Sequence, residues 1–318
     1  MQTDLENLFS QLREGDRRSA SRIMTLIENE GPGRKEALER LYHTESKALV
    51  VGVTGWPGVG KSSLINRIAG SFLDQGKKVG IIAIDPTSPL SGGGLLADRI
   101  RFREIEGTER LFVRSVASRG HHGGLSLYAR AFVKVMEVMG CDVILLETVG
   151  VGQDQITVSL IADTTIVVVA PGLGDYLQAI KSGVLEVGDI FVVNKADRPD
   201  ADRAVFDLEA AVRMRQAGGW LCPVVKAIAA EKSGAEALME EILRHASYCT
   251  KEKSVREGKV RAAKHEIRDA VESRLFEHFF GRDDLSGDSI NRLAREICAR
   301  KIDPYMIADM MLSEKGIG

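Results

Sequence analysis

Short, nearly continuous apolar runs alternate with longer amphipathic segments through the middle of the chain. The runs predict strands at 48–54, 78–84, 110–116, 143–147, 165–170, 190–193 and 222–227. The segments between them predict helices at 61–75, 125–139, 200–217 and 234–246. Runs without polar alternation are typical of strands covered on both faces. The pattern therefore predicts an α/β fold with a doubly wound, mostly parallel sheet.

Helical patterns flank this central region on both sides. Residues 1–47 predict an N-terminal helical extension, in which Asp16 caps the second helix, and we expect it to pack on the outside of the main domain at 48–247. Residues 248–318 are charge-rich and predict a C-terminal helical segment. Its apolar stripe must be covered by the main domain or by a second chain, and consists of Ile267, Val271, Leu275 and Phe279.

The segment from Val50 to Gly70 contains G-x-x-x-x-G-K-S between a predicted strand and a predicted helix. In this context backbone N–H groups and a helix N-terminus hold nucleotide phosphates. Lys61 supplies a positive charge, and Ser62 offers a hydroxyl to Mg²⁺. The fold is therefore predicted to be that of a P-loop NTPase. The residues expected to contact the nucleotide here are Gly55, Pro57, Gly58, Val59, Gly60, Lys61, Ser62 and Ser63.

Three acidic residues are candidates for holding the metal ion together with Ser62. Asp85 ends the second predicted strand, Asp98 lies on the Ser- and Gly-rich segment after it, and Glu147 closes an apolar strand. Ligands of doubly wound sheets bind at the carboxyl ends of the strands, where these carboxylates are suited to hold Mg²⁺ or its water. In the alternative interpretation, Asp85 initiates a turn before a proline and Asp98 caps a helix.

A switch segment is predicted directly after Glu147. Gly150 is expected to present its N–H to the γ-phosphate and to lose that contact after hydrolysis. In Ras-type GTPases a Gln directly after this glycine orients the attacking water, whereas Val151 stands here. The expected catalytic residues are Gln153, Lys61, Asp85, Asp98 and Glu147. Gln153, or an arginine such as Arg99 or Arg101 on the segment after Asp85, reaches the site only if the loop is remodelled. We therefore expect slow hydrolysis that a partner accelerates.

The string Asn194, Lys195, Ala196, Asp197 follows the predicted strand 190–193. An Asp carboxylate accepts hydrogen bonds from the N1–H and the exocyclic amine of guanine, whereas adenine has no donor at its N1. A buried polar group left without a partner is costly, so such a site discriminates strongly between the two bases. The predicted ligands are therefore GTP or GDP with Mg²⁺.

Segments spread along almost the whole chain resemble the MeaB family, the bacterial counterparts of the human methylmalonic aciduria type A protein, also called ArgK-type transport kinases. The resemblance implies a GTPase that acts as a chaperone for an adenosylcobalamin-dependent acyl-CoA mutase such as methylmalonyl-CoA mutase, gating cofactor loading and protecting the enzyme. It also implies a homodimer built on the helices after Tyr248, and a loop carrying Asp175 and Lys181 that reports to the partner. The similar segments are GDRRSASRIMTLIE, GVTGWPGVGKSSL, IDPTSPLSGGGLLADRIR, ETVGVGQ, PGLGDYLQAIKSG, VVNKAD and IDPYMIADMML.

The chain departs from the family pattern at three places. Trp56 occupies a phosphate-loop position where a smaller residue is common, and His122 stands where Leu is typical, beside His121. Ile228 and Ala229 replace the Ser-Ala pair expected near the guanine, so the base would rest on Asp197 and on backbone groups.

Composition and charge exclude several classes of partner and function. A net charge of −2 and a pI near 6.4 argue against nucleic acid or anionic membranes as partners. No uninterrupted apolar run approaches the length of a membrane span, so we expect a cytoplasmic protein. The four cysteines form no C-x-x-C pair and are expected to be buried thiols. A nickel-delivery GTPase would be expected to carry clusters of Cys and His, so the spread of the cysteines argues against that function. A kinase acting on a periplasmic amino-acid transport system is the alternative function, and it requires a base for the acceptor hydroxyl.

Overall fold

The computed structural model describes most of the chain and divides it by contacts into two compact units, 1–265 and 266–318, which are treated separately below. The described residues are 2–29, 31–45, 48–85, 108–117, 124–148, 153–172, 184–215, 219–231, 233–251, 253–280 and 288–314.

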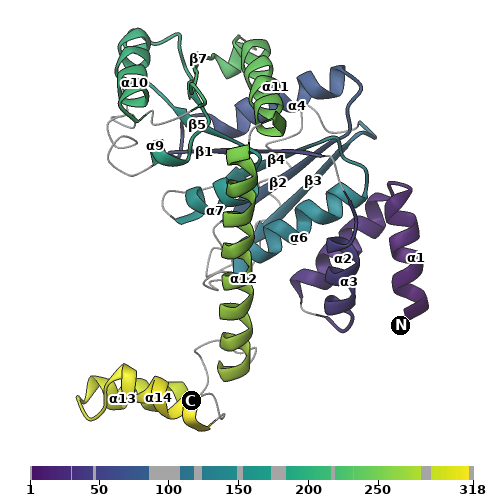
Figure 1. Ribbon diagram of the computed structural model, residues 1–318, viewed down its shortest axis with the longest axis vertical. Coiled ribbons are helices and arrows are strands. Elements are labelled where there is room, and N and C mark those ends of the chain that lie inside the picture. The colour runs from purple at the N-terminus through teal and green to yellow at the C-terminus, as the bar shows by residue number, and fades with distance from the viewer. Residues whose placement is uncertain are drawn as a thin grey trace. The chain divides into compact units, whose positions relative to one another are not determined.

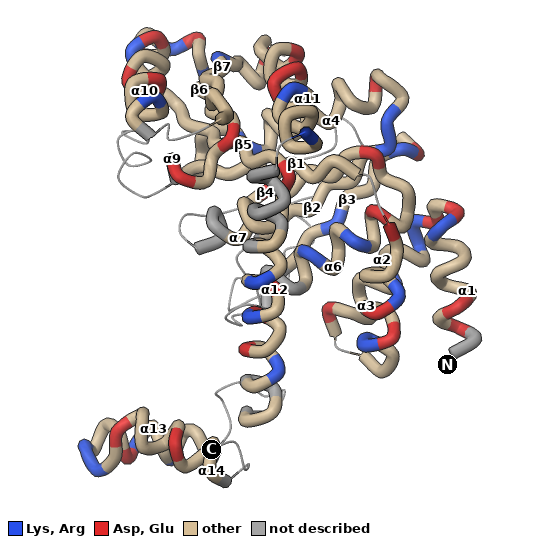
Figure 2. The backbone as a smooth tube through the Cα atoms, in the orientation of Figure 1, with Lys and Arg blue, Asp and Glu red and all other residues tan. Residues whose placement is uncertain are grey.

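The first unit is built on a sheet in which each strand runs parallel to its neighbours, in the order β3-β2-β4-β1-β5-β6-β7 (Figure 1). In Figure 2 these strands are drawn mostly in tan, whereas most blue and red segments lie on the helices. This agrees with the uncharged runs from which the strands were predicted. The parallel sheet is therefore confirmed. Its strands are β1 (Leu49–Gly55), β2 (Val79–Asp85), β3 (Leu111–Ala117), β4 (Val143–Thr148), β5 (Thr164–Val169), β6 (Ile190–Val193) and β7 (Val224–Lys226).

Alternate strand residues pack against two different helix layers, so the sheet is doubly wound. Val143 and Leu145 share an apolar cluster with α4 and α11, whereas Ile144 and Leu146 share one with α6. Side chains of α10 cover β5 and β6 in a third cluster. The helices of this region are α4 (Lys61–Asp74), α6 (Gly124–Val138), α7 (Gln153–Ile161), α9 (Val184–Val187), α10 (Ala201–Arg215) and α11 (Ala235–Lys251), with a 3-10 turn η1 (Ala229–Glu231).

Three N-terminal helices pack on the outside of α6, as expected (Figure 1). Their buried Phe9 and Leu12 lie in the same apolar cluster as Phe132 of α6. The Asp16 carboxylate accepts a hydrogen bond from the Ser19 N–H at 2.7 Å, which confirms the predicted N-cap, and hydrogen bonds from Ser19 lower the pKa of Asp16. The helices are α1 (Gln2–Arg13), α2 (Arg17–Glu28) and α3 (Arg34–Tyr42).

The C-terminal part of the chain is helical, as predicted, and consists of α12 (Lys253–Phe280), α13 (Asp288–Cys298) and α14 (Pro304–Glu314). Helix α13 was not predicted, although Ile290, Leu293 and Ile297 recur at helical spacing. Within the described part of the chain, no helix combines the length and the apolar character needed to cross a membrane.

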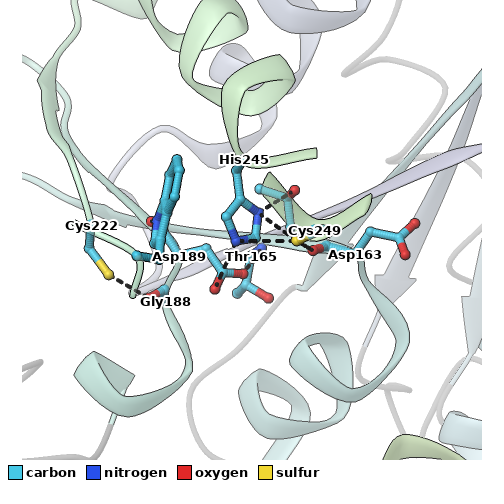
Figure 3. Close-up of polar contacts among 9 residues, drawn as sticks. Asp163, Thr165, Gly188, Asp189, Cys222, His245 and Cys249 are labelled. Carbon is cyan, nitrogen blue, oxygen red and sulfur yellow. Dashed lines mark hydrogen bonds and ion pairs between the residues drawn. The ribbon is translucent and has the colours of Figure 1, made fainter. Parts of the chain in front are cut away.

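The N-terminal edge of the sheet, opposite to the predicted nucleotide site, is tied to α11 by His245 (Figure 3). The imidazole Nδ1 lies 2.9 Å from the Thr164 hydroxyl, and Nε2 lies 3.5 Å from the Asp189 carboxylate. Trp220 packs edge-on against the His245 ring and donates its indole N–H to the Asp189 carbonyl at 2.8 Å. Burial lowers the pKa of His245, which favours the neutral imidazole.

The four cysteines differ in exposure. Cys141 is buried, and this burial raises the pKa of its thiol to about 12. Cys222 and Cys249 are half-buried, and Cys249 lies beside His245 in Figure 3. The expectation that all four are buried was wrong for Cys298, which lies on the charge-rich helix α13 and is exposed.

Candidate nucleotide-binding site

The loop between β1 and α4 has the backbone that a phosphate-binding loop requires. Gly55 and Gly60 have φ angles of 142° and 95°, which side chains rarely adopt. A Cβ at Gly55 would lie 2.1 Å from the carbonyl oxygen of Val168, and one at Gly60 would lie 2.3 Å from the side-chain Nδ2 of Asn194. The loop is thus pressed against β5 and against the segment after β6, and only glycine fits at both positions.

Lys61 begins α4 and holds the loop closed on itself. Its ammonium group donates to the carbonyl of Gly55 at 2.7 Å and to the carbonyl of Trp56 at 3.0 Å, and the residue is only 7% exposed. A bound phosphate would compete for this ammonium, which has three donors. Of the other predicted loop residues, Val59 is buried in the core, whereas Pro57, Gly58 and Ser63 are exposed.

Ser62 and Glu147 are brought together, as two of the four predicted metal ligands. The Ser62 hydroxyl donates a hydrogen bond to the Glu147 carboxylate, which is only 1% exposed. A buried hydrogen bond of 3.2 Å between Thr148 and Thr54 ties the end of β4 to β1. A hydroxyl and a carboxylate side by side are the oxygen donors that Mg²⁺ prefers, so the residues present fit this ion.

The other predicted switch and metal residues are described only in part. Asp85 ends β2, as predicted, in register with Ala117, and its side chain lies outside the described atoms. Gln153 is the first residue of α7, a helix that was not predicted, and its side chain is likewise not described. Outside the described residues lie Asp98, His121, His122, Gly150, Val151, Asp175 and Lys181.

Asn194 connects three parts of the site and is only 2% exposed. Its backbone N–H donates to the carbonyl of Val169 at 2.9 Å, and its side-chain NH₂ donates to the carbonyl of Val59 in the phosphate loop at 2.8 Å. Its side-chain oxygen accepts the N–H of Ala229 at 3.0 Å. One side chain therefore fixes the predicted phosphate loop and the predicted base-binding segments relative to one another.

Lys195 and Asp197 lie on the turn that follows. Lys195 adopts a left-handed backbone with φ of 58°, and its ammonium group donates to the carbonyl of Gly58 at 2.7 Å. The turn is closed by the N–H of Arg198, which donates to the carbonyl of Lys195 at 3.1 Å. Asp197 is exposed, so its carboxylate is accessible to a base.

Ala229, expected with Ile228 near the guanine, lies beside Asn194, and the anchoring of this segment was not predicted. The Ile228 N–H donates to the carbonyl of Ser233 at 3.0 Å, and Ala229 is buried. Arg67 of α4 donates to the carbonyls of Ala229 and Ala230 at 2.8 and 3.2 Å. No sequence signal distinguishes Arg67 from a solvated charge on a helix surface.

Comparisons with known proteins agree with this geometry. The family model described as "Methylmalonyl Co-A mutase-associated GTPase MeaB" matches residues 20–284. A protein of Pyrococcus abyssi is 37% identical over 98% of this chain and 96% of its own length, and the GTPase ArgK of Escherichia coli is 31% identical over 88% of each. The crystal structure of a LAO/AO transport system kinase aligns over 99% of both chains, with a TM-score of 0.72 and 25% identity. These matches, together with the phosphate loop and the hydrogen bonds of Asn194 to Val59 and Ala229, show that the chain belongs to the MeaB family of GTPases.

Proposed function

We propose that this chain is a GTP-driven switch that associates with a cobalamin-dependent acyl-CoA mutase such as methylmalonyl-CoA mutase, gates the loading of adenosylcobalamin and protects the enzyme. The observation that carries the nucleotide part is the position of Asn194, which links Val59 to Ala229. Support for the partner comes from the family description, which names a mutase-associated GTPase.

The residues of the site divide into a phosphate side and a base side. Lys61 and the loop from Gly55 to Ser63 hold the phosphates, while Asn194, Lys195 and Asp197 bind guanine. Ser62 and Glu147 would hold Mg²⁺ directly or through water, and Asp85 and Asp98 would approach it in the active arrangement. When bound, Mg²⁺ would neutralise negative charge on the phosphates.

Hydrolysis is gated by the partner in this proposal. Val151 cannot hold the attacking water, and Gln153 reaches it only after a change in the segment that contains Gly150. A mutase docked on the switch segments supplies that change, so GTP is hydrolysed only when the mutase is engaged. The loop with Asp175 and Lys181 reports the nucleotide state to the mutase.

The test is GTP turnover and adenosylcobalamin transfer, each measured with and without the mutase. We expect slow turnover alone, faster turnover with the mutase, and cofactor loading that depends on GTP. Lys61→Ala should abolish the nucleotide effect on loading. Fast turnover by the isolated chain, unchanged by any acyl-CoA mutase and by Gln153→Ala, would overturn the gating.

The switch is proposed to work as a homodimer formed by the segment 248–318. On α12, Ile267 and Val271 are 65% and 52% exposed, and Leu275 is exposed on the same stripe. Apolar residues at this spacing on a helix are stabilised when a second chain covers them. Light scattering should give twice the chain mass of 34.7 kDa, and Val271→Asp should give the monomer, whereas Ser273→Asp, on the opposite face of the helix, should stay dimeric. A monomeric wild type at micromolar concentration would contradict the dimer.

The alternative, a kinase of a transport component, is suggested by the name of the aligned transport system kinase. It predicts transfer of the γ-phosphate to a protein hydroxyl, whereas the GTPase releases inorganic phosphate. Radiolabelled GTP incubated with the transport component distinguishes the two outcomes.

A further inference from the structure

The backbone of Ala229 is held by hydrogen bonds on both sides of its Cα. Its N–H donates to the side-chain oxygen of Asn194 at 3.0 Å, and its carbonyl accepts a hydrogen bond from Arg67 Nε at 2.8 Å. A second nitrogen of the same guanidinium, Nη2, donates to the carbonyl of Ala230 at 3.2 Å. Arg67 therefore anchors two successive peptide units of η1.

The side chains of this segment offer nothing to a base. Ile228, Ala229 and Ala230 carry no side-chain hydrogen-bonding group, so any polar contact from this segment to guanine comes from its backbone. A backbone contact depends on where the peptide is held, because hydrogen bonds weaken steeply when their distance or angle changes. The position of the Ala229 peptide thus determines how well the segment recognises a base.

The anchor comes from the helix that also holds the phosphates. Lys61 and Ser62 stand at the start of α4, and Arg67 lies farther along the same helix. A guanidinium is planar and presents its donors in a rigid fork, so it fixes two neighbouring carbonyls at a smaller loss of side-chain freedom than a lysine ammonium. Through α4, the phosphate side and the base side of the site keep a fixed separation.

We propose that Arg67 is a positioning residue for guanine, which holds the Ala229–Ala230 backbone beside Asn194 and thereby contributes to the preference for guanine over adenine. The proposal rests on the guanine-nucleotide part of the proposed function and not on the mutase partner. Asp197 reads the edge of the base, and Arg67 keeps the opposing backbone in place.

The test is calorimetric titration of the full-length chain with GDP and with ADP. We expect Arg67→Ala to weaken GDP binding about tenfold and to leave ADP binding within about twofold, because ADP makes only the phosphate contacts in common with GDP. Arg67→Lys, which keeps a cationic donor group but not the planar fork, should bind GDP more tightly than Arg67→Ala. Arg213→Ala, which removes an exposed arginine of α10, serves as the matched control.

The ratio of the two affinities separates positioning from a general loss of structure. If Arg67 only supports the fold, GDP and ADP binding fall together and the ratio stays at its wild-type value, which overturns the proposal. Should the alanine variant not fold, Arg67→Gln is measured by the same ratio. A wild type that binds GDP and ADP equally overturns the guanine assignment and the role of Arg67 with it. A guanine-selective wild type with an unchanged ratio in Arg67→Ala overturns only the role of Arg67.

Discussion

The Ser62 hydroxyl donates a hydrogen bond to the Glu147 carboxylate, so the first turn of α4 and the end of β4 meet at one pair of oxygens. We expect Ser62→Ala and Glu147→Gln each to raise the Mg²⁺ concentration for half-maximal GTP turnover by about tenfold, because each removes one oxygen ligand of the ion or of its water. Ser71→Ala, on the same helix, should leave the Mg²⁺ dependence unchanged. An unchanged Mg²⁺ dependence in Glu147→Gln would remove this residue from the metal site.

Asp197 is exposed on the turn after β6, where its carboxylate is available to accept two hydrogen bonds that guanine donates. We expect Asp197→Ala to lower the preference for GDP over ADP by at least about a hundredfold, since each charge-assisted hydrogen bond contributes about 1.5–3 kcal/mol. Calorimetric titration with both nucleotides measures this. Asp200→Ala, an exposed carboxylate of the same loop, should keep the wild-type preference. Loss of ADP and GDP binding in equal measure would argue against base recognition by Asp197.

His245 makes stability depend on pH. Burial disfavours the imidazolium and lowers the pKa of His245 below its usual 6.5, while the nearby Asp189 and Asp163 oppose this shift and Arg244 adds to it. Between the folded pKa of His245 and 6.5, the unfolded chain binds more protons than the folded chain. The stability that the neutral His245 contributes is therefore fully present above pH 6.5 and is lost as the pH falls toward the folded pKa.

Melting temperatures at pH 7.5 and 5.5 check this prediction. The decrease on acidification should be smaller in His245→Gln than in the wild type, whereas His43→Gln, which removes an exposed histidine, should leave it unchanged. Equal decreases in the wild type and His245→Gln would show that other groups cause the acid sensitivity.

The thiols should react with a disulfide reagent in an order set by exposure and pKa. Cys298 is exposed, whereas the pKa of Cys141 is raised to about 12 by burial, so little of its reactive thiolate forms at pH 8. We expect one fast reaction from Cys298 and reaction of Cys141 only after unfolding. A fast phase that persists in Cys298→Ser would contradict this assignment.

The elements that could be predicted from the sequence are those defined by residues close together in the chain. Gly55, Lys61 and Ser62 were found because their spacing itself makes the loop, and the strand at 190–193 was found because it is uniformly apolar. The strand expected at 222–227 spans Val224–Lys226, and it starts later than predicted because Pro223 has no N–H to donate to the sheet. Arg67 and His245 were not found, because their partners come from segments distant in the chain and only the fold brings them together.

The phosphate loop contains Trp56, which is half-buried against the core, and the chain has one other tryptophan, Trp220, at the opposite edge of the sheet. Trp220 lies with its ring centre 4.7 Å from that of His245, close enough for a protonated imidazole to quench its emission. We expect the emission of Trp56 to respond to a nucleotide bound by the loop, because Trp56 is part of that loop. The two indoles are thus intrinsic fluorescent reporters of separate events. Trp56→Phe leaves the signal of Trp220, which follows protonation of His245, and Trp220→Phe leaves the signal of Trp56, which follows nucleotide binding, without any attached dye.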